Sequence, residues 1–571
     1  MFDLLIMNGT IVDGSGRPAF QGNVVVNDGK IVSVGEAAPP AKKTIDAKGK
    51  LVTPGWVDMH SHMDGQASWD PLLSPASNHG ITTLVMGNCG IGFAPCKPDE
   101  HELLINVVED VEDIPGAALA EGVTWAWETF PEYLDALEKM PRAIDIAAQV
   151  PHCAVRTYVM GRRGVNNESA SERDVQAMAA IVKEGIAAGA LGFTTSRTQL
   201  HTTRDGQVMP GTYASENELL GIGRAIGELG KGFYGLVSDF DDWQTEMAWM
   251  KKLAQDNHCA VHFVLFFRKE ADFDRIKQQI AFCRDAEKEG VKLIPHVSAR
   301  PVNILMGWDA TVNPFMFCPS FAELSLLTSE ARYQRLLDPV VRAQLLSEDV
   351  PLMGDEFMDS LSHGFDGFFE LGDPPNYEPK ADQSLAARAK KSGVSARELA
   401  YDLMLKNRGK NMLYYPCFGY ERKNLSAQFE IMKDDNTVLS LADTGAHCGV
   451  LCDASVPTQL LSYFVRDRAE GERLPLEWAV QAHTRKNAEA MGLFDRGLLS
   501  PGMKADINII DFEALQIHRP EVIYDLPAGG RRVFQGAEGY LATIVSGEVI
   551  MEKGRPTGAM PGRLIRGSQA A

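Results

Sequence analysis

The sequence predicts an α/β chain in which a TIM (β/α)8 barrel carries a small β-sandwich assembled from both termini. Three observations predict this architecture. Short apolar strands alternate with helical stretches through the middle of the chain, the two ends contain similar hairpin patterns, and 571 residues are too many for one compact core.

The hairpin patterns at the two ends predict the β-sandwich. Residues 23–34 hold two apolar strands around Asn27-Asp28-Gly29, and residues 542–551 hold two more around Ser546-Gly547. Residues 501–511 alternate like a further strand. One sandwich made from both ends is the economical interpretation, and two unrelated β-structures are the alternative.

These patterns divide the chain into two parts. We expect residues 1–55 and 498–571 to form the composite β-sandwich and residues 56–497 to form the barrel. The barrel carries a long insertion at about residues 301–437, where Pro, Phe and Met are scattered over more than a hundred positions. Since it follows the seventh candidate strand, on the face where barrel loops build active sites, it is either a lid over a pocket or a surface for oligomer contacts.

Eight apolar segments supply the strands that a TIM barrel requires. The helix before the fourth strand is the best marked, with Ser171 and Glu172 at its start and Gly189 at its end. Five apolar residues of this helix fall at helical spacing on one face: Val175, Met178, Ile181, Val182 and Ile186. The eight strands end near His62, Gly87, His152, Thr195, Asp239, Phe263, His296 and Asp443.

Composition and charge restrict the partners. The formal net charge of −20 argues against nucleic acid and anionic membranes, which attract basic surfaces. Nine cysteines without a Cys-x-x-Cys pair suit a reducing compartment. The sequence shows neither a signal peptide nor an apolar run of the roughly 18 residues that a membrane helix needs. We expect a cytoplasmic protein with a small-molecule substrate, and a homo-oligomer is one form of assembly that the sequence allows.

Two histidines after the first barrel strand predict a metal site. His60 and His62 close an apolar run that follows Pro54-Gly55. On a β-strand, side chains at i and i+2 point to the same face, so both imidazoles can bind one ion. This segment resembles the opening of the amidohydrolase superfamily, whose metal-dependent hydrolases begin their barrel with such a strand.

A second segment narrows the resemblance. Residues 80–90 are similar to the matching segment of D-aminoacylases (N-acyl-D-amino-acid deacylases), in which the cysteine at the position of Cys89 binds zinc. A thiolate is a good zinc ligand, although a cysteine taken alone is more often an apolar packing residue. The likeness covers most of residues 1–300 and 435–555. Further similar segments are 111–120, 127–130, 151–156 and 189–193.

The last barrel strand offers the catalytic carboxylate. The superfamily places an aspartate there that contacts metal and handles the proton, and Asp443 matches that position. The alternative is that Asp443 only caps the next helix. His447 is expected to line the same pocket or to be an ordinary polar loop residue.

The chain also departs from the family pattern. Deacylases of this family carry metal-binding histidines at the ends of the fifth and sixth strands, but here the fifth has none and His262 in the sixth is displaced by about two residues. We therefore expect one zinc ion per chain, with Asp239, His262 and His296 as further metal or pocket residues. Arg197 and Arg300 are candidates for binding a substrate carboxylate.

The resemblance implies a metal-dependent hydrolase of a C–N (amide) bond other than a peptide bond. The favoured substrate is an N-acyl amino acid. A cyclic amide or another acyl compound is an alternative, and so is a degenerate barrel that binds a ligand without turning it over.

Overall fold

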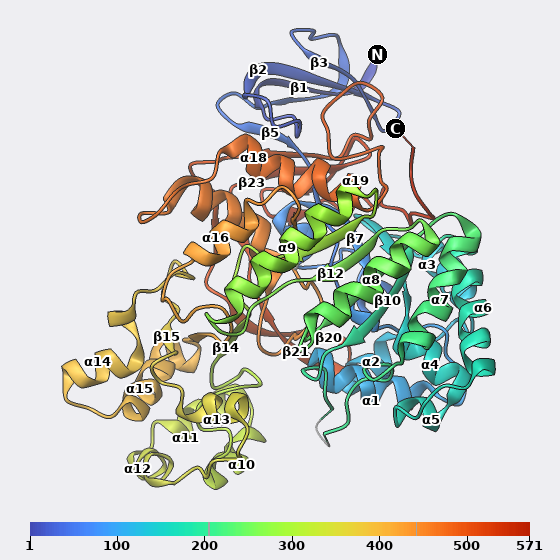
Figure 1. Cartoon of the computed structure of the whole chain (residues 1–571). Helices are drawn as coiled ribbons and strands as arrows, with labels where there is room; N and C mark the ends of the chain where they lie inside the picture. Colours follow the sequence, from blue (N-terminus) through green and yellow to red (C-terminus); the bar gives the residue numbers. More distant parts are fainter. Residues whose placement is uncertain (204–205, 441, 571) are drawn as a thin grey trace.

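The computed structural model describes residues 1–203, 206–440 and 442–570. Figure 1 shows three regions: strands from both termini on one side, a set of parallel strands with outer helices in the centre, and an extended insertion on the opposite side. The central region carries the candidate site, and the insertion reaches over it.

The central strands follow the order of a (β/α)8 barrel. All neighbours are parallel, in a three-stranded run β6-β7-β8 and a six-stranded run β9-β10-β11-β12-β13-β17, and only Gln149 separates β8 from β9. A parallel bridge between Ser61 and Thr444 links the segments that follow β6 and β17. The strands are β6 (Trp56–Asp58), β7 (Ile81–Met86), β8 (Asp145–Ala148), β9 (Val150–Pro151), β10 (Gly192–Arg197), β11 (Phe233–Ser238), β12 (Val261–Val264), β13 (Leu293–Val297) and β17 (Val438–Leu439).

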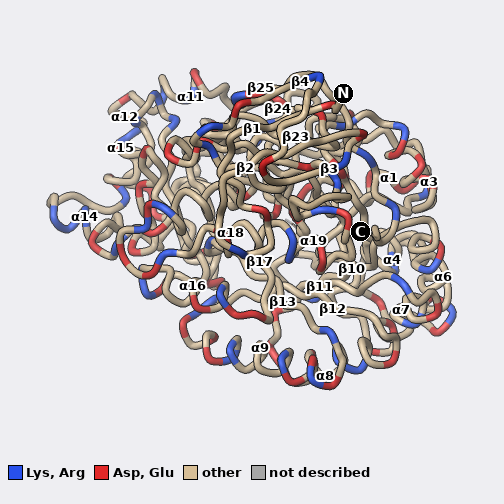
Figure 2. The backbone as a smooth tube through the Cα atoms, turned by 90° about the horizontal axis from the view of Figure 1, so that it is seen from above, with Lys and Arg blue, Asp and Glu red and all other residues tan. Residues whose placement is uncertain are grey.

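Amphipathic helices cover the outside of these strands. In α6, the Ser171 hydroxyl and the Asp174 carboxylate form a capping box and Gly189 ends the helix, which confirms the predicted start and end. Figure 2 shows acidic and basic residues interspersed along the outer helices α8 and α9. The helices of this region are α1 (His101–Glu112), α2 (Gly116–Gly122), α3 (Phe130–Glu138), α4 (His152–Met160), α5 (Arg162–Val165), α6 (Glu172–Ala188), α7 (Glu216–Leu229), α8 (Trp243–Asn257) and α9 (Asp272–Lys288). The later helices α17 (Val456–Gln459), α18 (Leu476–Gln481) and α19 (Asn487–Ala490) complete this cover.

Both termini contribute to one nine-stranded sheet, in the order β25-β24-β23-β18-β5-β1-β2-β3 with β4 beside β1. The two halves join where β5 pairs antiparallel with β18, Val52 opposite Ile509. Both predicted hairpins are present, β2–β3 and β23–β24. The strands are β1 (Phe2–Ile11), β2 (Phe20–Asn27), β3 (Lys30–Gly35), β4 (Ala41–Asp46), β5 (Leu51–Pro54), β18 (Ile507–Ile510), β23 (Tyr540–Val545), β24 (Glu548–Glu552) and β25 (Arg555–Pro556).

Parts of the predicted sandwich segment 498–571 lie against the barrel. Between β18 and β23 the chain forms two nested antiparallel strand pairs, β20–β21 inside β19–β22, and there Val533 N donates to Cys448 O. Near the C-terminus, Ile565 packs in an apolar cluster with Val57 of β6 and Val85 of β7. The domain bounds stay a prediction. The extra strands are β19 (Gln516–Ile517), β20 (Glu521–Leu526), β21 (Gly530–Phe534) and β22 (Ala537–Glu538).

The insertion has its own apolar core, which includes Trp308, Phe315 and Tyr401. A three-stranded sheet, β14-β16-β15, connects this core to the barrel side. Its elements are β14 (Asn303–Met306), α10 (Pro319–Ser325), α11 (Ser329–Leu336), α12 (Pro339–Ser347), α13 (Glu356–His363), β15 (Phe369–Glu370), α14 (Leu385–Ser392), α15 (Ala396–Gly409), β16 (Leu413–Pro416) and α16 (Ser426–Met432).

A buried ion cluster behind the barrel predicts acid-sensitive stability. Glu218 on α7 accepts from His152 Nε2 (3.1 Å) and Arg156 Nε (2.9 Å). Burial by itself would raise the pKa of Glu218, but these two partners hold it at about 2, below its ordinary 4.5. The ionised carboxylate therefore adds stability above pH 4.5 that is lost as pH falls toward 2, on the order of 3 kcal/mol.

We expect Glu218→Gln to lower the urea midpoint of unfolding at pH 7, with the difference from the native chain shrinking toward pH 2.5. Urea unfolding curves of both chains at several pH values check this. An equal difference at every pH would show that the Glu218 charge does not contribute in this way.

Candidate metal centre

His60 and His62 lie just after β6, in a segment held between β7 and β17. The strand ends at Asp58, whose carboxylate accepts from His60 N (3.1 Å), and pairing resumes with His62 N donating to Thr444 O (2.8 Å). The prediction that both histidines sit on the strand is therefore wrong in detail. The Asp58 side chain takes the place of a strand partner at His60, and Ser61 N bonds to Val85 O (3.1 Å) beyond it.

Cys89 faces the two histidines from the turn that follows β7. Its Sγ lies 3.3 Å from His60 Nε2, and its backbone is left-handed with φ 54°. Gly87, two residues before Cys89, has φ 82°. A Cβ at Gly87 would approach Gln149 O to 2.5 Å, so only glycine fits at this position. The Asn88 amide donates to Val85 O (2.9 Å) and thereby holds the turn on the strand end.

Asp443 completes the cluster from beyond β17. Its Oδ1 lies 3.3 Å from His60 Nε2 and 3.9 Å from His62 Nε2. The ligand atoms of His60, His62 and Cys89 all lie within 4.8 Å of one another, and all three side chains are buried. The structure thus brings together the four residues predicted as metal ligands. Two imidazoles, a thiol and a carboxylate are donors that suit zinc.

Glu112, the last residue of α1, supports His62 and was not predicted from the sequence. Its Oε1 lies 3.1 Å from His62 Nδ1, and its side chain is 2% exposed. Burial would raise the pKa of Glu112, but the His62 imidazole holds it at about 2. A carboxylate on one ring nitrogen orients the other nitrogen toward a metal. The available signal was the position of Glu112 in the family-like segment 111–120.

Burial dominates the electrostatics of the other groups. It raises the pKa of Asp443 to about 6 and that of the Cys89 thiol to about 11. It also lowers the pKa of His60 well below its ordinary range. The cluster is therefore a poorly solvated site in which uncompensated charge is costly.

His262 and His296 lie beside this cluster and bond to each other. His262 Nδ1 is 2.9 Å from His296 Nε2, and the rings of His60 and His296 meet edge to face with centroids 6.2 Å apart. Burial lowers the pKa of His262 to about 3. The pair sits inside the barrel next to His60, and its mutual hydrogen bond uses one nitrogen of each ring.

Two predicted residues point elsewhere. Asp239 accepts from Thr198 Oγ1 (2.6 Å) and pairs with Arg268. Arg197 forms a two-pronged ion pair with Glu246. Neither is among the residues that line the cavity described next. Strand-end position alone could not reveal these pairings.

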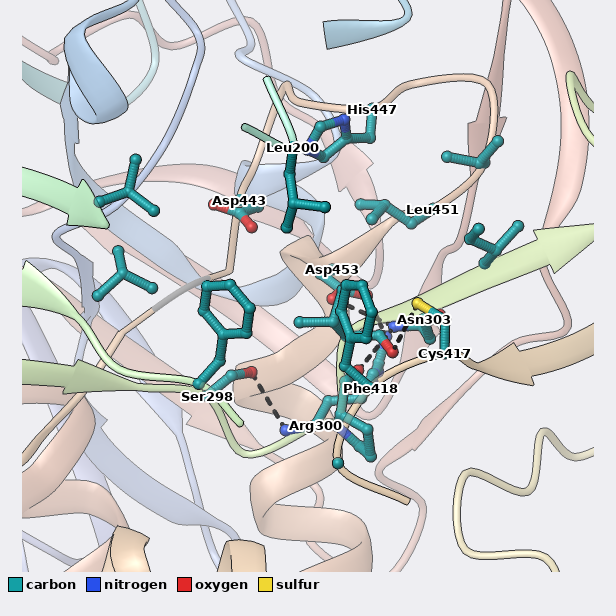
Figure 3. A pocket seen from close by; sticks show the side chains of 18 of the residues that line it. Leu200, Ser298, Arg300, Asn303, Cys417, Phe418, Asp443, His447, Leu451 and Asp453 are labelled. Atoms are coloured by element: carbon teal, nitrogen blue, oxygen red, sulfur yellow. Dashed lines mark hydrogen bonds and ion pairs between the residues drawn. The ribbon is translucent and has the colours of Figure 1, made fainter. Parts of the chain in front are cut away.

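A cavity of about 330 Å³ opens on the cluster and extends to the insertion. Figure 3 shows Asp443 and His447 on one side of it, with Arg300, Asn303 and Phe418 across from them. The predicted pocket residues His447 and Arg300 therefore do line this space. His201 lines it too and was missed; burial lowers its pKa to about 4. The insertion residues Phe357, Leu361, Cys417 and Phe418 also contribute to the lining.

Comparison with known proteins decides the family. A sequence profile of the amidohydrolase family matches residues 43–313 and 383–551. The chain belongs to the amidohydrolase family. This confirms the resemblance seen in the sequence, and the matched ranges leave out residues 314–382, which are about half of the insertion.

Curated relatives of this amidohydrolase include two deacylases of Alcaligenes xylosoxydans xylosoxydans. An N-acyl-D-aspartate deacylase is 34% identical over 194 residues, and a D-aminoacylase is 33% identical over 195 residues; each match covers 34% of this chain. The matches span 36% and 37% of those two relatives. An uncharacterized protein of Mycobacterium tuberculosis is 24% identical over 97% of this chain and 92% of its own.

Solved structures share the fold. A D-aminoacylase superposes with a TM-score of 0.65 at 21% identity, covering 99% of this chain and 100% of its own. An N-acyl-D-glutamate deacylase from Bordetella bronchiseptica, solved with zinc and a phosphonate inhibitor, gives 0.65 at 22% identity and covers 99% of both chains. The predicted TIM-barrel fold of this amidohydrolase is confirmed. Within the described ranges, no helix combines the length and apolarity needed to cross a membrane.

Proposed function

We propose that this amidohydrolase hydrolyses the C–N bond of a small-molecule amide with one zinc ion bound by His60, His62, Cys89 and Asp443. The observation that carries the proposal is the convergence of three buried ligand atoms within 4.8 Å at the floor of the cavity, with a carboxylate beside them. A buried set of this composition is costly to fold unless something binds it. The names of the deacylase relatives support an acyl amide as substrate.

The donor set fits zinc, which takes nitrogen and sulfur ligands in a compact site. When bound, zinc polarises the substrate carbonyl and lowers the pKa of water toward neutrality. One ion per chain is proposed because β11 supplies no histidine, and because His262 and His296 bond to each other.

Asp443 is the proposed acid–base group. Its side chain is 29% exposed, whereas His60 and His62 are almost fully buried, so its carboxylate reaches the cavity. It accepts the proton of the attacking water and delivers it to the leaving nitrogen. His447 stands on the same side of the cavity (Figure 3) and is placed to contact the substrate near the scissile bond.

The proposal is tested with the purified protein and a panel of N-acyl amines and N-acyl amino acids. We expect amine release by the zinc-loaded protein, loss of release after chelation, and recovery when zinc is added back. A folded, zinc-loaded protein that releases amine from no member of the panel would instead support a barrel that only binds its ligand.

Glu112→Gln is expected to lower zinc affinity by about 10- to 100-fold, because the carboxylate that orients His62 loses its charge. Competition between the protein and a chelator measures this affinity. Glu109→Gln, on the same helix but outside the cavity, is the matched control and should retain native affinity. Unchanged affinity in Glu112→Gln would remove Glu112 from the support of the metal.

We also propose a cytoplasmic location, supported by nine cysteines that are all free thiols in the structure. Assembly as a homo-oligomer stays a prediction.

A further inference from the structure

The cavity has two ends of different chemistry. One end holds the metal cluster and His447. The other, here called the apolar arm, is built largely by the insertion and the loop after Asp443. The apolar arm consists of Phe266, Val302, Ile304, Val312, Phe357, Leu361, Cys417, Phe418 and Val450. Since the insertion supplies most of it, this part of the chain shapes the substrate site.

Stacked aromatic rings form one wall of the apolar arm. The ring of Phe418 stacks on Phe266 with centroids 6.1 Å apart and on Phe357 with centroids 5.7 Å apart, at interplanar angles of 27° and 29°. The three rings come from the loop after β12, from α13 and from the loop after β16. Their mutual packing holds the wall in place before a ligand arrives, so an apolar group that binds there pays little for ordering the site.

The cavity offers a substrate carboxylate no uncommitted cation among its described lining residues. Arg300 is the single arginine or lysine in that lining. Its Nη1 pairs with Asp453 Oδ1 at 2.7 Å, its Nη2 donates to Ser455 Oγ at 3.0 Å, and its Nε donates to Gln459.

The face of the Arg300 guanidinium is also occupied. It lies over the ring of Tyr377, 3.8 Å from the centroid, and Arg300 is 2% exposed. The remaining charged lining groups are the carboxylates of Glu112, Asp443 and Asp453 together with the histidines. A zinc ion would add two positive charges, which the Cys89 thiolate and the Asp443 carboxylate balance. A carboxylate on the substrate would therefore be buried unpaired and near like charge.

We infer that the substrate is an uncharged amide whose apolar group fills the apolar arm, rather than an N-acyl amino acid with a free carboxylate. The inference rests on the proposed function and specifies its substrate class. It differs from the N-acyl amino acid favoured by the sequence resemblance, because the two arginines considered for the carboxylate, Arg197 and Arg300, are both engaged with acidic partners.

The test compares matched amides that differ in one charge. N-acyl-3-methylbutylamines have the skeleton of N-acyl-leucines without the carboxylate. Both series are prepared with acetyl, butanoyl and octanoyl groups, and the leucine series is prepared from both enantiomers of leucine. We expect kcat/KM for the uncharged member to exceed that of its carboxylate partner by at least about tenfold. For the uncharged series, kcat/KM should also rise about fourfold per methylene added to the acyl chain, until the apolar arm is filled. A preference for the carboxylate members would overturn the inference.

Variants test whether the dependence of kcat/KM on acyl length arises in the apolar arm. Phe418→Ala should flatten the dependence of kcat/KM on acyl length, with a larger loss for the octanoyl compound than for the acetyl compound. Phe494→Ala, an exposed phenylalanine outside the cavity, should keep the native dependence. Phe357→Ala, which removes a ring that stacks on Phe418, serves the same purpose if Phe418→Ala does not fold, as judged by circular dichroism. A native dependence in a folded variant of either residue would overturn the assignment to the apolar arm.

Failure of the proposed function gives a different result. If the zinc-loaded protein hydrolyses none of these compounds, the proposed hydrolytic function is wrong. Calorimetric measurement of the binding of the same compounds then still tests which class of compound the cavity accepts. Tighter binding of N-octanoyl-3-methylbutylamine than of N-octanoyl-leucine would support the inference, and the reverse order would overturn it.

Discussion

Replacing Asp443 with asparagine is expected to lower turnover by about 10³- to 10⁴-fold while most of the zinc is retained. Asparagine keeps the shape of the carboxylate and can still offer an oxygen, and His60, His62 and Cys89 remain in place. It cannot accept a proton at neutral pH, so the attacking water loses its base and the leaving nitrogen loses its acid. General acid–base assistance is worth about 10²- to 10⁴-fold, and one residue performing both roles places the loss at the upper end.

The measurement is turnover on any accepted amide alongside zinc content by elemental analysis. Asp467→Asn, at a half-exposed position away from the cavity, is the control and should behave like the native chain. Near-native turnover in zinc-loaded Asp443→Asn would remove Asp443 from the reaction and leave His447 or His201 as the base.

Cys89→Ser is expected to weaken zinc binding by more than about 100-fold, beyond the 10- to 100-fold cost of losing a supporting hydrogen bond. The thiolate is a good zinc ligand, whereas the serine hydroxyl stays protonated at neutral pH. Turnover should fall in proportion to the zinc that is lost and recover in part at high zinc concentration. Chelator competition and turnover as a function of added zinc measure both effects.

Cys96→Ser is the matched control, since Cys96 is also a buried free thiol but lies outside the cavity. It should retain native zinc content and turnover. If Cys89→Ser does the same, Cys89 is a packing residue and the site has a different set of ligands.

Local sequence patterns predicted most of the fold. The eight barrel strands, the helix from Ser171 to Gly189 and the hairpins at both ends are each specified by residues close in sequence: apolar periodicity, a capping box and turn residues. The four proposed metal ligands came from the two histidines that follow the first barrel strand and from the family resemblance of the segments that hold Cys89 and Asp443. Parallel strand ends of a barrel converge on one face, so residues far apart in sequence could be placed together.

Side-chain partners across the fold could not be read in this way. Glu112 contacts His62 because α1 packs over the strand ends. Arg197 pairs with Glu246, and Arg300 pairs with Asp453; both partners lie in distant segments of the chain. The position of a residue at a strand end predicts where it lies in the barrel. It does not predict whether the charge of its side chain is already neutralised by a partner. The insertion was equally hard to assign, because its own core of buried residues carries no signal of what it covers.

We propose that one zinc ion held by these four residues is required for amide hydrolysis. The most direct test of this requirement is to strip the protein of metal and to measure turnover as zinc is added back in known equivalents. We expect no turnover in the metal-free protein, a linear rise as zinc is added, and a plateau at about one equivalent per chain. Undiminished hydrolysis without metal would contradict the requirement for zinc, and a plateau reached only at two equivalents would contradict the single-ion site.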